Sequence, residues 1–256
     1  MSSTTRTCEF CGAELEPVII DNPFSTVGFG TRPKHDPNRR LVIGFRTCGC
    51  EQAQARLAAT MREEEQEAAR RAHRVVDAKL SKAGIKPRYR AATHPEEGLW
   101  EAVRDGIGLY ICGRVGTGKT HLASAVARRL VLDGKMTVRM MTTVDVMDAF
   151  KATFGSSGSE REVAARLGKV DVLVLDDLGK EPPTDWTLSR LFQIVNARYE
   201  AMRPIVITTQ FSRSALIKRL AKNGDEETAI AIVSRLCETS RTVVLDGADR
   251  RVSHGR

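Results

Sequence analysis

The stretch GRVGTGKT at residues 113–120 constrains the fold of this chain more than any other segment. It follows the apolar run GLYIC and precedes HLASAVARRL, which has the composition of a helix. The pattern G-x4-G-K-[ST] is typical of a loop that wraps a phosphate group between a strand and a helix. A strand before the loop and a helix after it therefore favour phosphate binding over a plain glycine turn.

Strands and helices are expected to alternate from about residue 90 onward. The expected strands lie near residues 107–112, 136–141, 170–175, 204–209 and 241–245. The expected helices lie near residues 119–133, 144–154, 160–168, 185–201, 212–222 and 227–238. This alternation predicts a parallel sheet with helices on both faces. The run VDVLVLDD has the continuous apolar character of a strand buried on both sides.

Each residue type in the glycine-rich loop has a physical task. Glycines let the backbone curl so that several N–H groups point at one phosphate, and the following helix presents its positive dipole end to the anion. Lys119 would reach the β- and γ-phosphates, and the Thr120 hydroxyl would ligate Mg²⁺. The expected nucleotide-binding residues of the loop are Gly113, Arg114, Val115, Gly116, Thr117, Gly118, Lys119, Thr120 and His121.

A pair of acids, Asp176 and Asp177, ends the apolar run VLVLDD. Paired acids alone usually mark the exit of a strand into solvent. Here they lie on a predicted parallel strand 57 residues after Lys119, which favours a Walker B motif. In that motif the first carboxylate holds the Mg²⁺ water shell, and its neighbour orients or polarises the attacking water. We therefore expect Asp176 at the metal and Asp177 at the water.

Four of the six cysteines occur in residues 1–50, as CEFC and CGC. Two thiolate pairs at short spacing suit a tetrahedral zinc site, and so short a segment with little apolar content could hardly fold without a metal. The expected zinc ligands are Cys8, Cys11, Cys48 and Cys50. His35 is an alternative to one of them, while Cys112 and Cys237 are expected to be small core residues.

Composition narrows the class of protein and its partners. With a net charge of +8, the chain suits an acidic partner such as nucleic acid. Aromatic residues make up only 5%, which argues against a β-sandwich or an aromatic RNA-stacking sheet. No apolar run is long enough to span a membrane and no signal peptide is evident, so we expect a cytoplasmic protein with reduced cysteines.

Residues 51–83 contain no Gly or Pro and are rich in Ala, Glu and Arg, which predicts one long helix. Gly84 and Pro87 are expected to end it. Its apolar positions are mostly alanine, so it is either an exposed connector or one partner of a helical pair. Residues 51–90 carry ten Lys and Arg against six Asp and Glu, so the basic excess lies outside the cysteine-rich segment.

Several stretches match one family in order along the chain. They are AGIKPRYR, LYICGRVGTGKTHLASAVARRL, DVLVLDDLGKEPPTDW, PIVITTQFSRSAL and IVSRLCETSRTVVLDGADRR. Over about residues 83–251 the chain resembles the AAA+ helicase-loader group typified by DnaC, DnaI and the transposition helper IstB. The resemblance implies a P-loop AAA+ core, with a five-stranded parallel sheet, helices on both faces and a reduced lid. It also implies three parts: a zinc-binding helicase-interaction module at 1–50, a helical connector at 51–88 and an AAA+ ATPase domain at 89–256.

The same resemblance assigns roles outside the loop. Gln210 occupies the sensor-1 position, where the family usually has Asn. Arg235 occupies the position of an arginine finger that acts on a neighbouring subunit; the alternative is an arginine that caps its own helix. Arg250 or Arg251 would supply the sensor-2 cation. Asp177 stands where most AAA+ ATPases carry Glu, and the shorter acid implies slow hydrolysis, which suits a switch.

A family insertion would fall within residues 143–168 and contact single-stranded DNA in initiator-type members. This segment contains three cations, Lys151, Arg161 and Arg166, and two phenylalanines, Phe150 and Phe154. Cations and aromatic rings together suit contact with single-stranded DNA. That the two phenylalanines are core residues is an equal alternative.

The implied function is an ATP-switched loader that binds a hexameric replicative helicase through the zinc module and DNA through the AAA+ domain. It would self-associate and use ATP, Mg²⁺ and Zn²⁺. The alternatives are an IstB-like transposase helper that coats duplex DNA, a small-molecule kinase with the same phosphate loop, and an adaptor that binds ATP without hydrolysing it. The cysteine-rich front end favours the loader.

Overall fold

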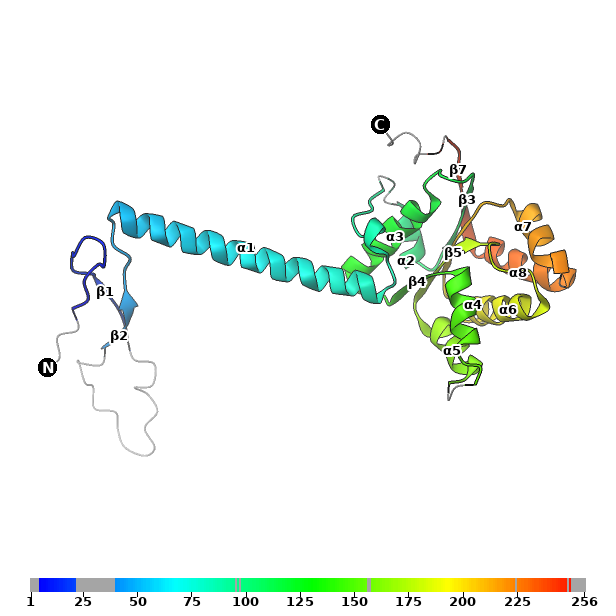
Figure 1. Ribbon diagram of the computed structural model, residues 1–256, viewed down its shortest axis with the longest axis horizontal. Coiled ribbons are helices and arrows are strands. Elements are labelled where there is room, and N and C mark those ends of the chain that lie inside the picture. The colour runs from blue at the N-terminus through cyan, green and yellow to red at the C-terminus, as the bar shows by residue number, and fades with distance from the viewer. Residues whose placement is uncertain are drawn as a thin grey trace, which may run out of the picture. The chain divides into compact units, whose positions relative to one another are not determined.

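The computed structural model describes residues 5–21, 40–94, 96, 98–155, 158–223, 225–247 and 249 (Figure 1). The chain forms two compact units, Met1–His73 and Arg74–Arg256. No helix in the described part of the chain is long and apolar enough to cross a bilayer. His35, Arg250 and Arg251 lie outside the described residues, so their expected roles stay predictions.

The N-terminal unit contains one strand pair and most of a long helix. Strands β1 (Pro17–Asp21) and β2 (Arg40–Phe45) pair antiparallel. Helix α1 (Glu51–Lys82) follows, as the composition of residues 51–83 predicted. The boundary between the two units falls within α1.

The C-terminal unit is built on a five-stranded parallel sheet, as predicted. Its strands are β3 (Gly108–Gly113), β4 (Val138–Thr142), β5 (Val172–Leu178), β6 (Ile205–Thr209) and β7 (Ser240–Leu245). Their order is β4-β5-β6-β3-β7, and every neighbouring pair is parallel. The chain therefore places the carboxyl ends of β3, β5 and β6, and the loops that follow them, at one edge of the sheet.

Helices cover both faces of this sheet (Figure 1). Helices α2 (Gly98–Arg104) and α3 (Lys119–Asp133) pack on one face, together with the last turns of α1. The other face is covered by α4 (Thr143–Lys151), α5 (Glu160–Lys169), α6 (Asp185–Glu200), α7 (Arg213–Leu220) and α8 (Glu226–Glu238). Because β5 has helices on both sides, residues Val172 to Leu175 are fully buried, which explains its continuous apolar sequence.

Helix starts in this unit are set by local side-chain caps. Thr142 accepts from the Asp145 backbone N–H at the start of α4, and Ser159 accepts from the Glu162 backbone N–H at the start of α5. In both helices the acidic side chain bonds back to the cap residue, which makes a capping box. These caps fix where the segment between β4 and β5 turns into helix.

A close backbone approach follows α1. Gly84 has φ +88°, and a side chain there would collide with the Met140 carbonyl of β4. The Met140 N–H donates to the Ala83 carbonyl at 2.7 Å. The chain then forms the short 3-10 helix η2 (Pro87–Tyr89), which was not predicted from the sequence. This approach ties the end of α1 to the sheet and positions Arg88 and Tyr89.

Candidate nucleotide-binding site and cysteine cluster

The glycine-rich loop connects β3 to α3, as the motif predicted. Gly118 caps α3 with φ +97°, a conformation that residues with a side chain rarely adopt. The Lys119 ammonium donates to the Gly113 carbonyl at 2.9 Å and to the Arg114 carbonyl at 2.7 Å. The Thr117 hydroxyl also donates to the Arg114 carbonyl, at 2.9 Å. The loop thus curls around the lysine, with the first turn of α3 directly behind it.

Thr120 and Asp176 meet at the base of this loop. The Thr120 hydroxyl donates to Asp176 Oδ1 at 3.0 Å, and the Thr208 hydroxyl donates to the same oxygen at 2.6 Å. Burial raises the pKa of the Asp176 carboxyl, and a bound cation would oppose that effect by stabilising the charged form. A hydroxyl and a carboxylate oxygen side by side are the donor set that P-loop enzymes offer to Mg²⁺. The residues therefore fit the expected metal.

Asp177 adopts an unusual backbone conformation, with φ +61°. Its N–H donates to the Thr208 hydroxyl at 2.9 Å. Its carboxylate accepts from the Lys180 ammonium at 2.7 Å. Thr208 therefore bonds to both acids of the motif and fixes the position of one relative to the other.

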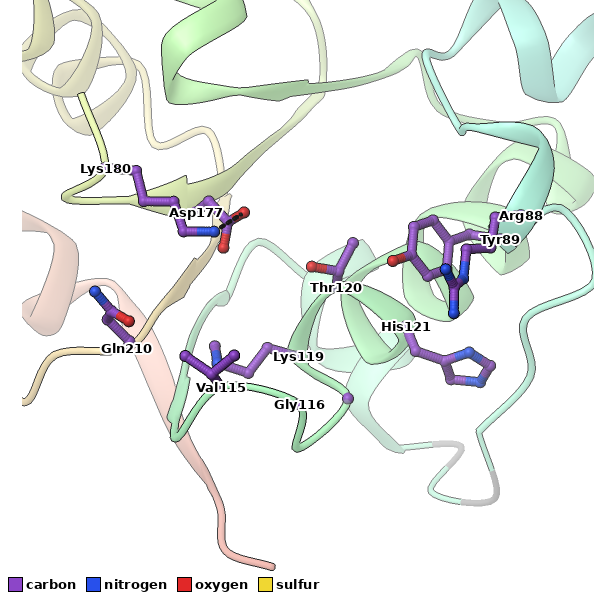
Figure 2. Close-up of a pocket in the computed structure, with 11 residues that line it drawn as sticks. Arg88, Tyr89, Val115, Gly116, Lys119, Thr120, His121, Asp177, Lys180 and Gln210 are labelled. Atoms are coloured by element: carbon purple, nitrogen blue, oxygen red, sulfur yellow. Dashed lines mark hydrogen bonds and ion pairs between the residues drawn. The ribbon is translucent and has the colours of Figure 1, made fainter. Parts of the chain in front are cut away.

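A cavity of about 970 Å³ opens above the loop (Figure 2). Its lining residues are Arg88, Tyr89, Val115, Gly116, Gly118, Lys119, Thr120, His121, Asp177, Lys180 and Gln210. In Figure 2, Asp177, Lys180 and Gln210 lie at one end, and Arg88, Tyr89 and His121 lie at the other. Because Lys180 is paired with Asp177, the lining keeps a net excess of two cations, Arg88 and Lys119, which suits a polyanion such as a nucleoside triphosphate.

Three residues of this lining were missed by reasoning from the sequence: Arg88, Tyr89 and Lys180. The first two precede the glycine-rich loop by more than 20 residues and reach the cavity only because Gly84 and Met140 tie their segment to the sheet. Lys180 gave a usable signal, since it follows the acid pair within one short loop. Conversely, Gly113, Arg114 and Thr117 were expected at the nucleotide and Asp176 at the metal. All four lie beside the lining, where they shape the loop and the metal end.

Arg235 lies on α8 and is not among the residues that line the cavity. Its guanidinium donates to the Ala231 carbonyl of its own helix at 3.1 Å. It also lies 5.3 Å from the ring centroid of Phe192 and 5.4 Å from that of Tyr199. Within the chain the arginine therefore bonds to its own helix, and its action on a neighbouring subunit stays a prediction.

The four expected cysteine ligands converge in the N-terminal unit. The sulfur atoms of Cys8, Cys11, Cys48 and Cys50 all lie within 4.8 Å of one another. The closest pairs are Cys11–Cys48 at 3.4 Å and Cys8–Cys50 at 3.8 Å. A zinc tetrahedron with Zn–S bonds of about 2.3 Å has edges of about 3.8 Å, so the cluster has the size that zinc requires.

Local backbone structure favours the thiolate of one member of the cluster. Backbone N–H groups of Cys11 and Phe10 lower the pKa of the Cys8 thiol to about 7, whereas the neighbouring thiols raise the pKa of Cys48 and burial raises that of Cys50. The Cys8 N–H donates to the Ala13 carbonyl at 2.8 Å, which closes the turn that carries Cys8 and Cys11. Because thiolates bind zinc and thiols do not, this turn favours the ligating form of Cys8.

The two phenylalanines of the segment expected to contact DNA differ in their exposure. Phe150 is fully buried in the core, whereas the Phe154 side chain is 61% exposed. The Phe154 ring lies 5.9 Å from that of Trp186 in an edge arrangement. Arg161 and Arg166 of α5 are exposed. Only Phe154 is therefore available for stacking on a base.

The sequence comparisons find replication proteins. The chain is 37% identical over 111 residues to the replicative helicase loader DnaC of Escherichia coli K12, covering 43% of this chain and 45% of that protein. It is 34% identical over 106 residues to the DnaC of Buchnera aphidicola from Schizaphis graminum, covering 40% and 43%. The chain thus matches less than half the length of these curated relatives.

The structural comparisons agree on the fold. A crystal structure of the DnaC helicase loader superposes with a TM-score of 0.50 at 26% identity, covering 63% of this chain and 100% of that one. A crystal structure of DnaI gives a TM-score of 0.53 at 22% identity, covering 63% and 95%. Residues 101–256, more than half of the chain, match the family described as IstB-like ATP binding protein. The chain therefore belongs to the IstB/DnaC-like family of AAA+ ATPases.

Proposed function

We propose that this protein is an ATP-switched loader of a replicative helicase. The observation that carries the proposal is that Lys119 and Thr120 line one cavity, with Asp176 bonded to Thr120 beside it, in a chain whose relatives include proteins named replicative helicase loaders. A magnesium triphosphate fits this cavity by charge, by donor set and by size. The cysteine cluster supplies a second module of the kind a loader needs to hold its helicase.

The chemistry follows from the positions of the side chains. Lys119 and the first turn of α3 bind and orient the phosphates. Thr120 and Asp176 hold Mg²⁺, which would neutralise charge on the phosphates. Asp177 accepts a proton from the attacking water, and the Gln210 amide at the same end of the cavity aligns that water. A short acid and a long amide at these positions make hydrolysis slow, so ATP occupancy acts as a switch.

The remaining parts of the proposal assign the modules. Residues 1–50 bind zinc and the helicase, and residues 89–256 form the ATPase domain. Residues 51–88 form a helical connector between these two parts. The ATPase domain self-associates, with Arg235 acting on the neighbouring nucleotide, and touches single-stranded DNA through Phe154 and the exposed arginines of α5. Arg250 or Arg251 adds a sensor-2 cation. A cytoplasmic location is part of the same proposal.

The decisive experiment is capture of purified hexameric replicative helicase by the full-length chain in the presence of ATP and Mg²⁺. We expect the wild-type chain to retain the helicase and the Cys8→Ser/Cys11→Ser variant to lose it. A Cys112→Ser variant serves as the control, because Cys112 lies outside the cluster. If Cys8→Ser/Cys11→Ser captures the helicase as well as the wild-type chain does, the module assignment is wrong. If neither the wild-type chain nor Cys112→Ser captures the helicase, the loader function is wrong.

The second candidate is an IstB-like transposase helper, which the family match over residues 101–256 favours. Such a helper would bind a transposase and duplex DNA, whereas a loader would bind a replicative helicase. The same capture assay with a transposase in place of the helicase separates the two functions. Retention by the transposase alone reverses their order.

A further inference from the structure

The loop after β5 is held rigidly from two sides. Glu181 is 1% exposed, and its carboxylate accepts from the Gly179 N–H at 2.9 Å and from the Thr143 hydroxyl of α4 at 2.7 Å. The Arg219 guanidinium of α7 donates to the Gly179 carbonyl at 2.8 Å and to the Glu181 carbonyl at 3.0 Å. A buried network with every partner in place makes this loop a fixed platform.

Asp177 is fixed on that platform. Its N–H donates to the Thr208 hydroxyl, and its carbonyl accepts from the Lys180 N–H at 3.2 Å. The Thr143 hydroxyl that donates to Glu181 lies 3.1 Å from the same carbonyl. These bonds hold its φ of +61°, a conformation that persists only where the surroundings enforce it. The side chains of Asp177 and Lys180 therefore face the same end of the cavity (Figure 2).

The two side chains are paired there. The Lys180 ammonium lies 2.7 Å from Asp177 Oδ2, and among the described residues it has no other acceptor. The side chains are 53% and 32% exposed, so the pair can open without a change in the core. While the pair is closed, Asp177 Oδ2 is already engaged by the ammonium ion and is less available to the attacking water.

We propose that Lys180 is a positioning residue that restrains Asp177, so that hydrolysis stays slow while the ion pair is closed. The restraint rests on the proposed hydrolysis at this site and adds a residue that the family pattern does not assign. It acts within one chain, because Asp177 at the end of β5 and Lys180 in the loop after it are only three residues apart. Since a half-exposed ion pair is weak, the expected restraint is about two- to fivefold in rate.

A different role for Lys180 makes the opposite prediction. As a second cation on the γ-phosphate, its loss would lower kcat and raise KM for ATP. As a restraint on Asp177, its loss raises kcat and leaves KM unchanged, because no contact with the substrate is removed. The observed pairing with Asp177 favours the restraint.

The test is steady-state ATP hydrolysis by the full-length chain. We expect Lys180→Met to raise kcat about two- to fivefold with KM changed by much less than that, because an exposed ion pair is lost. Lys180→Arg keeps the cation and should keep the slow rate. Lys135→Met is the matched control, since Lys135 is an exposed lysine outside the cavity, and it should behave as wild type. Adding Asp177→Asn to Lys180→Met should remove the gain, since the gain acts through that carboxylate.

The outcomes separate this proposal from the proposed function. If wild-type turnover depends on Lys119 but Lys180→Met does not raise kcat, the restraint is wrong and the ATPase stands. A rise in KM with a fall in kcat also overturns the restraint. If no variant hydrolyses ATP, Lys180→Met included, the proposed hydrolysis and the restraint both fail. A thermal melt of each variant checks that the fold is unchanged.

Discussion

At the scale of single residues, Thr208 links the two acids at the end of β5. Its hydroxyl donates to Asp176 and accepts from the Asp177 N–H. Reasoning from the sequence placed weight on Gln210, two residues later, because the motif ITTQ suggested a sensor position. Thr208 shows no such signal, since its role depends on the pairing of β5 with β6.

Thr208→Val tests this link while keeping the shape of the side chain. It leaves a buried carboxylate oxygen and a backbone N–H each without one partner, so we expect a loss of about 1–3 kcal/mol in the free energy of unfolding. ATP hydrolysis should fall as well, because both acids lose a positioning bond. Urea denaturation and a phosphate-release assay measure the two effects. Thr208→Ser, which keeps the hydroxyl, should retain most of both; equal losses for Val and Ser would contradict the link.

Lys119 is the residue on which the proposed chemistry most depends. Lys119→Ala removes the cation inside the loop, and we expect ATP turnover to fall by about 100-fold or more, as for other preorganised electrostatic groups. Phosphate release at saturating ATP is the measurement. Lys135→Ala is again the matched control. Turnover that survives Lys119→Ala would assign the hydrolysis to a contaminant or another site.

At the scale of elements, helix α6 ties the starts of strands β5 and β6 to α5 through one buried arginine. Arg198 is fully buried. Its guanidinium donates at 2.8 to 2.9 Å to four backbone carbonyls, those of Leu167, Val170, Asp171 and Pro204. Burial lowers the pKa of Arg198 to about 10. The arginine therefore ties the carboxyl end of α5 to the residues just before β5 and β6.

Arg198→Met keeps much of the volume and removes all of these donors. Four carbonyls then lose a partner in the interior, and we expect a loss of about 3–5 kcal/mol in the free energy of unfolding, as for other broken buried networks. Urea denaturation followed by tryptophan fluorescence measures it, since both tryptophans lie in the C-terminal unit. Arg161→Met, at an exposed position, should change stability by less than about 0.5 kcal/mol. A similar loss of stability in both variants would contradict this role of Arg198.

At the scale of the whole molecule, the two units differ in what holds them together. The strand pair of the N-terminal unit leaves large apolar side chains exposed, namely Ile19, Ile20, Val42 and Ile43. The C-terminal unit instead has two large buried clusters, one on each face of its sheet. A unit without a sufficient core needs another source of stability, which the cysteine cluster can supply.

Metal removal should therefore affect one unit only. We expect one zinc per chain by elemental analysis, fewer in Cys8→Ser/Cys11→Ser, and release of the zinc by a strong chelator. Chelation should expose the N-terminal segment to limited proteolysis because the cluster no longer holds it. The tryptophan-monitored melt of the C-terminal unit should stay within about 2 °C, since a separate unit contributes little to that transition. A large shift in this melt would show that the zinc supports the ATPase unit.

The elements of the C-terminal unit were largely predictable because their signals are local. All five predicted strands and six predicted helices are present within a few residues of the expected bounds. Helix α2 and the strands β1 and β2 were missed. Helix α2 has only seven residues, too few for a helical period to show, and β2 follows prolines and charges that mask its alternation.

The sequence by itself determined the phosphate loop, the acid pair, the long helix and the cysteine pairs, because each depends on a short spacing or on composition. Tertiary structure alone decided which distant residues complete these sites. Arg88 and Tyr89 reach the cavity through the approach of Gly84 to β4, and Thr208 meets both acids through strand pairing. Contacts between residues far apart in the chain leave no periodic or local signal, since they arise only when the sheet forms.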